Sequence, residues 1–134
     1  SGETPSSSSS PKMISPQAAR SASTRRCAAE TLLRAQPMTQ FTPHTVTDPS
    51  ALMREIETCR ANGYAIENGE YKIGLRSISA PVYTVEGKAA YAVGVIGMFR
   101  SPHSEEFRAA VEQVCVTASM ISTALGYRKQ EETR

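Results

Sequence analysis

Hydrophobic residues recur at helical spacing in two segments of the chain. The first segment follows Asp48-Pro49, where a capping side chain precedes a proline at the first helical position, and it is closed by Gly63. The second lies between Ser101-Pro102 and Gly126. The apolar positions are Leu52, Met53, Ile56 and Cys59 in the first segment, and Phe107, Val111, Val114, Ala118, Ile121 and Leu125 in the second. Steps of three and four residues predict two amphipathic helices.

Between these two segments the pattern changes to that of β-strands. One strand is predicted over residues 73–83 and another over residues 89–99, and a turn at Glu86-Gly87 joins them into an antiparallel hairpin. Pro81 lacks a backbone donor, which indicates a bulge or an edge position. The second strand is apolar on both faces, and we expect both faces to be covered. Its large apolar residues are Val93, Val95, Ile96 and Met98.

The chain divides into three predicted parts. Residues 1–24 are rich in Ser and Pro and predict a disordered leader; a phosphorylated or proline-docking segment is the alternative. Residues 25–129 are predicted to form one folded portion, which begins with a short helix from Arg25 to Ala35 before Pro37. Residues 130–134 are charged and predicted to fray.

Composition excludes several classes of protein. The chain has 134 residues, enough for one modest domain, and its formal charge of +2 is spread out, without a basic run suited to nucleic acid or an anionic membrane. No apolar run approaches the roughly 20 residues that span a bilayer. Three cysteines, an odd number, and no secretory signal indicate reduced thiols and a cytoplasmic protein.

The sequence offers little catalytic chemistry. His44 and His103 are far apart, and neither has ligands at metal-binding spacing, so we predict no metal site and no cofactor. Cys59 lies on an apolar helix face, where a buried thiol is expected rather than a reactive one. Ser77 could be a nucleophile, but a strand serine without an assigned base more often contributes to packing or to a polar pocket. We therefore predict no catalytic residue.

Several short motifs follow one another in a fixed order between about residues 40 and 127. They are F-T-P-H-T-V-T-D-P from Phe41, G-Y-A from Gly63, Glu70 followed by G-L-R-S-I-S-A-P-V from Gly74, and I-S-T-A-L-G from Ile121. Their order and spacing resemble the C-terminal part of the effector-binding domain of IclR-type bacterial transcriptional regulators. The resemblance implies an α/β (α+β) fold, with a GAF-like curved antiparallel sheet covered by helices. It also implies that a small organic acid or related metabolite binds between sheet and loops.

Five positions are candidates for this ligand pocket. By resemblance, Glu67 falls where the family often has an acidic residue at the rim, and Ser77 where a cysteine commonly lines the pocket. Leu75 and Ser77 are two apart on one predicted strand, as are Gly94 and Ile96 on the next, so each pair should share a face. Some relatives that bind oxo-acids carry serines at the positions of Gly94 and Ile96. A roomier, more apolar pocket for a bulkier or aromatic acid is expected here, and ordinary sheet core is the alternative.

Residues 1–40 contain neither the family's winged helix-turn-helix nor the first strands of its sensing domain. The chain is therefore predicted to be a partial domain, with DNA binding left to a separate module. A sheet without its first strands would expose an edge, which favours homo-oligomers. Three functions remain open: a ligand sensor, a dimerisation remnant without ligand, and a small enzyme using Ser77 and Glu67. The effector, the target genes and the direction of regulation are not specified by the sequence.

Overall fold

The structure, a computed structural model, describes the backbone of residues 16–129 and the side chains of residues 25–129. The predicted tail, 130–134, and most of the predicted leader, 1–15, lie outside the described residues. The chain separates into two units, residues 1–36 and 37–134, and each is described by itself. The compact second unit begins at Pro37 rather than at residue 25.

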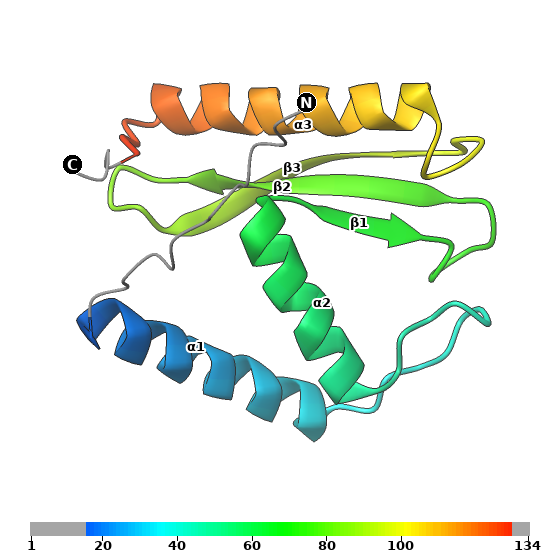
Figure 1. Cartoon of the computed structure of the whole chain (residues 1–134), viewed down its shortest axis with the longest axis horizontal. Helices are drawn as coiled ribbons and strands as arrows, with labels where there is room; N and C mark the ends of the chain where they lie inside the picture. Colours follow the sequence, from blue (N-terminus) through cyan, green and yellow to red (C-terminus); the bar gives the residue numbers. More distant parts are fainter. Residues whose placement is uncertain (1–15, 130–134) are drawn as a thin grey trace, which may run out of the picture. The chain divides into compact units, whose positions relative to one another are not determined.

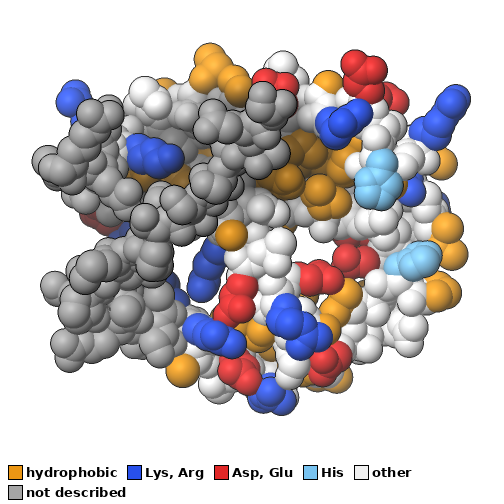
Figure 2. Space-filling model, in the orientation of Figure 1, with side chains coloured by type: hydrophobic (Ala, Val, Ile, Leu, Met, Phe, Trp, Pro, Cys, Tyr) orange, Lys and Arg blue, Asp and Glu red, His pale blue; other side chains and the backbone are white. Residues whose placement is uncertain are grey.

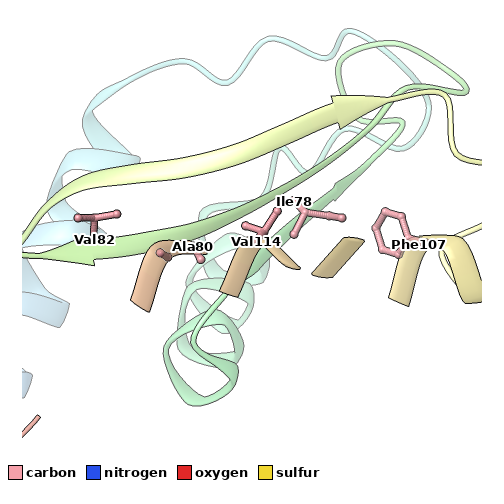
Figure 3. Close-up of a cluster of buried hydrophobic side chains, with 6 residues drawn as sticks. Ile78, Ala80, Val82, Phe107 and Val114 are labelled. Carbon is pink, nitrogen blue, oxygen red and sulfur yellow. The ribbon is translucent and has the colours of Figure 1, made fainter. Parts of the chain in front are cut away.

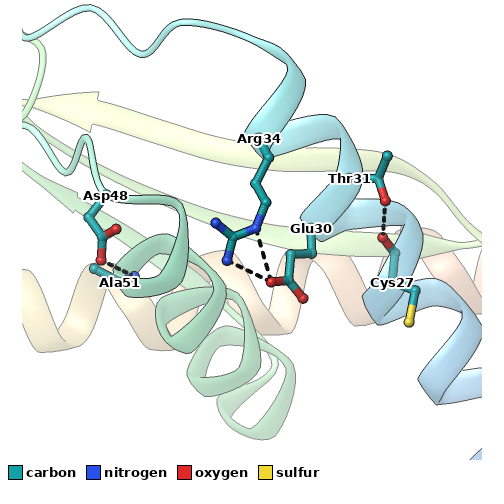
Figure 4. Close-up of polar contacts among 6 residues, drawn as sticks. All are labelled: Cys27, Glu30, Thr31, Arg34, Asp48 and Ala51. Carbon is teal, nitrogen blue, oxygen red and sulfur yellow. Dashed lines mark hydrogen bonds and ion pairs between the residues drawn. The ribbon is translucent and has the colours of Figure 1, made fainter.

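The first unit contains α1 (Pro16–Ala35). The predicted helix over Arg25–Ala35 is present, but it begins at Pro16, inside the segment predicted to be a disordered leader. Residues 16–24 are rich in Ala with Gln and Arg, which favour helix, and proline is tolerated in a first turn. Within α1 the Arg34 guanidinium lies 2.9 Å from the Glu30 carboxylate, one turn away (Figure 4).

The second unit begins its regular structure with α2 (Pro49–Asn62), and both predicted caps of this helix are confirmed. The Asp48 carboxylate accepts a hydrogen bond of 2.9 Å from the Ala51 N–H (Figure 4). At the other end Gly63 adopts φ 80° and its N–H donates to the Cys59 carbonyl at 2.8 Å. These caps fix where the chain leaves the helix and enters the sheet.

The sheet has three antiparallel strands in the order β1 (Ala65–Asn68), β2 (Arg76–Tyr83) and β3 (Ala89–Gly97), as Figure 1 shows. The predicted hairpin is confirmed, with its turn at Gly87, whose N–H donates to Thr84. The short strand β1 was not predicted, because only Ile66 in it is a large apolar residue.

Strand β2 is shorter than predicted and occupies the centre of the sheet. It begins at Arg76, since residues 72–75 form a turn in which the Leu75 N–H donates to the Lys72 carbonyl. Pro81 therefore lies in a central strand, not at an edge, and the irregularity in register comes just after it, between Val82 and Tyr83. The freed Tyr83 N–H donates instead to the Ser122 hydroxyl at 2.9 Å.

The core lies between β2 and α3 (Glu105–Ala124). Alternate residues of β2 meet one face of the helix (Figure 3), and the buried cluster comprises Ile78, Ala80, Val82, Phe107, Val114 and Ala118. Helix α3 is capped by Ser104, whose hydroxyl accepts from the Phe107 N–H at 3.2 Å, instead of starting at Ser101-Pro102.

The buried stripe of α3 also differs from the prediction at its C-terminal end. Ile121 and Leu125 are exposed, and Ser122 is buried in their place. The Ser122 hydroxyl occupies this buried position because it accepts a hydrogen bond from the Tyr83 N–H of β2.

The prediction that both faces of the second strand are covered is wrong. In the described part of the chain α3 contacts one face of β3, and side chains on both faces stay accessible. Tyr91 is 65% exposed, Ile96 71% and, just beyond the strand, Met98 84%. The hydrophobic pattern of β3 is that of a buried strand, but the described residues include no second layer over it.

Ser122→Ala tests the link between the core helix and the bulge. Ser122 is 2% exposed, accepts from Tyr83 N–H and donates to the Ala118 carbonyl at 2.7 Å. Its removal leaves the Tyr83 N–H unpaired, so we expect the free energy of unfolding to fall by about 1 to 3 kcal/mol in urea denaturation. Ser119→Ala, an exposed change in the same helix, is the control and should have little effect. Equal stability of the two variants would contradict this role of Ser122.

Candidate functional site

The two faces of the sheet differ in what covers them. Ile78, Ala80 and Val82 point from β2 into the core with α3. Because side chains alternate along a strand, Ser77 and Ser79 point to the opposite face. This second face carries the predicted site.

The strand register aligns the predicted site residues across this face. Glu67 on β1 pairs with Ser77 on β2, and Ser77 pairs with Ile96 on β3, so these three form one row. Gly94 lies in the next row, opposite Ser79. Directly paired residues share a face, so four of the five predicted positions lie together.

Leu75, the fifth predicted position, is placed differently. It lies one residue before β2, not within the strand, and its carbonyl accepts from the Gly69 N–H at 2.9 Å. The alternation that put Leu75 on the face of Ser77 therefore does not extend to it. Leu75 belongs to the loop at the end of the row.

Glu67 holds that loop in place. Its Oε1 accepts hydrogen bonds from the backbone N–H groups of Glu70 and Tyr71, the latter at 3.1 Å. Its Oε2 accepts from the Ser77 hydroxyl at 3.5 Å, the outer limit of a hydrogen bond. The Tyr71 ring in turn packs edge-on against Phe41, with centroids 5.3 Å apart. The carboxylate thus links the rim loop to the middle of the row.

A second loop, residues 41–45, supports the rim from outside. The buried Thr42 hydroxyl donates to the Gly69 carbonyl at 2.6 Å, and the Thr45 hydroxyl donates to the Glu70 carbonyl. Sequence reasoning did not assign a role to these threonines. The sequence feature that could have indicated this role is a pair of threonines on either side of a proline turn, since Thr hydroxyls commonly form hydrogen bonds with the backbone groups of loops.

Gly94 leaves no space for a side chain. A Cβ at this position would lie 2.5 Å from the Ile78 carbonyl oxygen and 2.7 Å from the Ser79 Oγ. The first contact is with backbone, which cannot turn away. A serine at this position would require β2 and β3 to shift, so the glycine sets how closely the two strands approach on this face.

Ser77 is not arranged as a nucleophile. Its hydroxyl has a long contact with a carboxylate that already accepts two backbone hydrogen bonds. His44 and His103 are exposed. The side chains of residues 25–129 include no group of three or more His, Cys, Asp or Glu placed to hold a metal ion.

Acidic side chains gather beside the row, near α2. Burial raises the pKa of the Glu70 carboxyl, and the negative charges of Glu55 and then Glu67 raise it further. Burial, followed by Glu55, also raises the pKa of the half-buried Cys59 thiol, which favours the protonated, unreactive form. Figure 2 shows red acidic side chains and orange apolar side chains around a hollow on the viewed face.

Two grooves of the second unit lie away from the row. One, of about 450 Å³, runs between the end of α2, β2 and α3, and Arg60, Pro81, Tyr83, Ser119 and Tyr127 are among its lining residues. The other, of about 340 Å³, lies along α2 and β1, and Glu55, Cys59, Tyr64, Ile66 and Glu70 contribute to it. Neither is lined by Leu75, Ser77, Gly94 or Ile96. Among the predicted positions, Gly94 and Ile96 are exposed and Ser77 is partly buried.

Comparison with known proteins gives a consistent result. Residues 18–123 match the family described as bacterial transcriptional regulator IclR C-terminal. The chain is 33% identical over 103 residues to the HTH-type transcriptional regulator BhcR of Paracoccus denitrificans, and 36% identical over 93 residues to the HTH-type transcriptional repressor AllR of Klebsiella pneumoniae. The matches cover 77% and 69% of this chain but 37% and 34% of those proteins. The chain therefore spans about a third of their length.

Solved structures agree on the fold. The C-terminal domain of the Escherichia coli regulator KdgR superposes with a TM-score of 0.69 at 25% identity, covering 76% of this chain and 62% of that domain. The Thermotoga maritima IclR gives a TM-score of 0.66 at 31% identity, covering 73% of this chain and 40% of that one. The α+β fold is confirmed, and the described elements form part of such a domain. No helix among the described residues has the length and apolar character needed to cross a bilayer.

The raised pKa of Glu70 predicts a dependence of stability on pH. The folded state binds this proton more tightly than the unfolded chain does, so ionising Glu70 costs stability at pH values above its folded pKa. This cost shrinks as the pH falls through the folded pKa and is absent below the unfolded pKa. Glu70→Gln should raise the free energy of unfolding at pH 8 by less than about 1 kcal/mol, because water screens a partly exposed charge. The gain should vanish in acid. Glu112→Gln on the exposed side of α3 is the control; a gain from Glu70→Gln that persists in acid would contradict the explanation.

Proposed function

Because the chain belongs to the IclR C-terminal family of bacterial transcriptional regulators, as its motifs predicted, we propose that it is a ligand-sensing regulatory domain. The ligand is a small organic acid, with a bulkier or aromatic acid preferred over a small oxo-acid. It binds on the sheet face opposite α3. The observation that supports this most is the row Glu67, Ser77, Ile96, which is aligned by the strand register and not covered by α3.

Each of the five positions has a distinct part in this proposal. Ser77 offers a hydroxyl in the middle of the row, and a ligand carboxylate is a better acceptor than its long contact with Glu67. Glu67 is itself negative, so the acid group lies on the side of the row away from Glu67, toward the neighbouring row in which Ser79 pairs with Gly94. Ile96, 71% exposed, and Leu75 provide apolar contacts for the body of the ligand.

Signal transmission requires more than this chain. The HTH designation of the relatives refers to a DNA-binding module, and we propose that the ligand acts on such a separate module in the full-length protein. A ligand with different affinity for two arrangements of paired modules shifts their populations and so changes DNA binding. The protein would act as a homo-oligomer in the cytoplasm, where the bacterial chromosome lies, and without catalysis.

A role in assembly without a ligand is the second candidate. The exposed apolar residues of β3 support it, because a strand with this pattern is normally covered. The two candidates make different predictions, since only the sensor is stabilised by a small molecule.

A thermal-shift screen of small oxo-acids and aromatic carboxylic acids tests the proposal. A ligand that prefers the folded state raises the melting temperature, by an amount that corresponds to about 2.7 kcal/mol at a hundred times its Kd. We expect Ser77→Ala to remove most of the shift and Ile96→Ser to change which acids are preferred. Arg60→Ala, in the groove beside α3, is the matched control and should respond as the unaltered chain does. No shift with any acid, or a shift lost in Arg60→Ala but kept in Ser77→Ala, would contradict the assignment.

A further inference from the structure

The larger groove of the second unit lies where β2 extends past the start of β1. Strand β1 begins at Ala65, which pairs with Ser79, so among the described residues no strand pairs with residues 80–83 on that side. The last turn of α2 and the C-terminal half of α3 border this space and leave a groove of about 450 Å³. Its described lining belongs entirely to the second unit and includes no residue of β3. The volume lies in the range of about 300 to 1,000 Å³ that is typical of small-molecule sites.

One wall of this groove carries a pair of stacked aromatic rings. The centroids of Tyr83 and Tyr127 are 5.0 Å apart, with 25° between the ring planes, and both half-buried rings line the groove. Ser122 holds both residues, because its hydroxyl accepts from the Tyr83 N–H and its carbonyl accepts from the Tyr127 N–H, each at 2.9 Å. The wall is therefore fixed by the fold itself and offers apolar ring surface to a planar ligand.

The charge of the groove is positive. Arg60 and Lys129 are exposed and contribute to its lining, and neither forms an ion pair with another described residue. The described lining includes no Asp or Glu. The C-terminal ends of α2 and α3 lie nearby, and each is equivalent to about half a negative charge. Two full positive charges exceed this contribution, so the groove favours an anion.

We propose that this groove is a second small-molecule site, which binds a phosphate monoester of a planar ring. The ring packs against the wall formed by Tyr83 and Tyr127, and Arg60 and Lys129 bind the phosphate. The exposed Ser119 hydroxyl is a further donor on the α3 side. A phosphate monoester carries about two negative charges at neutral pH, because its second pKa is about 6. It therefore matches both cations, whereas a carboxylate offers a single charge.

This site is independent of the proposed carboxylic acid site. Ser77 lies on the sheet face opposite α3 and is not part of the groove, and Arg60 is not part of the row on that face. The two ligands also differ in charge. Variants of the groove and of the sheet face therefore report on the two sites separately.

Isothermal titration calorimetry of the full chain with phenyl phosphate tests the proposal. We expect saturable binding, and phenyl sulfate, which has nearly the same shape but one negative charge, should bind at least about fivefold more weakly. Arg60→Ala should raise the Kd for phenyl phosphate by at least about fivefold. Ser119→Phe should abolish binding, because the larger side chain fills the groove, and it should keep the melting temperature, because Ser119 is exposed.

Arg54→Ala is the matched control. Arg54 is an exposed arginine of the same helix that does not line the groove, so this change should leave the Kd as it is. Equal effects of Arg54→Ala and Arg60→Ala would mean attraction to overall charge and would overturn the proposal. So would the absence of saturable heat, equal affinity for phenyl sulfate, or binding that is lost in Ser77→Ala and kept in Arg60→Ala.

Discussion

The packing of α3 against one face of β2 is the contact on which the second unit depends. Ile78 and Phe107 are its most completely buried large side chains, and β2 is the strand that pairs with both neighbours. Burying this face fixes the register, because a slip of one residue would turn Ile78, Ala80 and Val82 outward. The same alternation turns Ser77 toward the other face. The alternation of side chains along β2 therefore determines both which residues form the core and which face carries the candidate site.

Hydrogen bonds at the two ends of β2 hold this strand in place. At one end the Glu67 carboxylate binds the rim loop, and Thr42 and Thr45 hold the same loop from outside. At the other end Ser122 accepts from the backbone where the register shifts. Between these two ends Ser77 and Ser79 lie on the face opposite α3 and are only partly buried.

The sequence predicted elements best where local signals were strong. The caps of α2 at Asp48 and Gly63 and the turn at Gly87 follow from side-chain chemistry and glycine conformation within a few residues. The short strand β1 could not be predicted, because it has little hydrophobic pattern and is stabilised by its pairing with β2. The apolar pattern of β3 is typical of a covered strand, but the described residues place no second layer over it, and the pattern does not specify which segment would provide one.

The sequence predicted which candidate positions share a sheet face better than it predicted their detailed geometry. Alternation and family resemblance brought Glu67, Ser77, Gly94 and Ile96 together, and the register places them side by side. The separation of Leu75 from the strand depends on a turn closed by backbone hydrogen bonds, which the residue types did not indicate. The close approach of Ile78 to Gly94 likewise depends on how tightly two strands pack, a tertiary property.

The central claim is that the sheet face opposite α3 is the ligand face, and an NMR titration tests it most directly. Backbone amide resonances of the unaltered chain would be followed while a stabilising carboxylic acid is added. We expect saturable changes centred on Glu67, Ser77 and Ile96, with little change along the core-facing side of α3. Changes confined to Arg60, Ser119 and Tyr127, in the groove between α2 and α3, would contradict the claim.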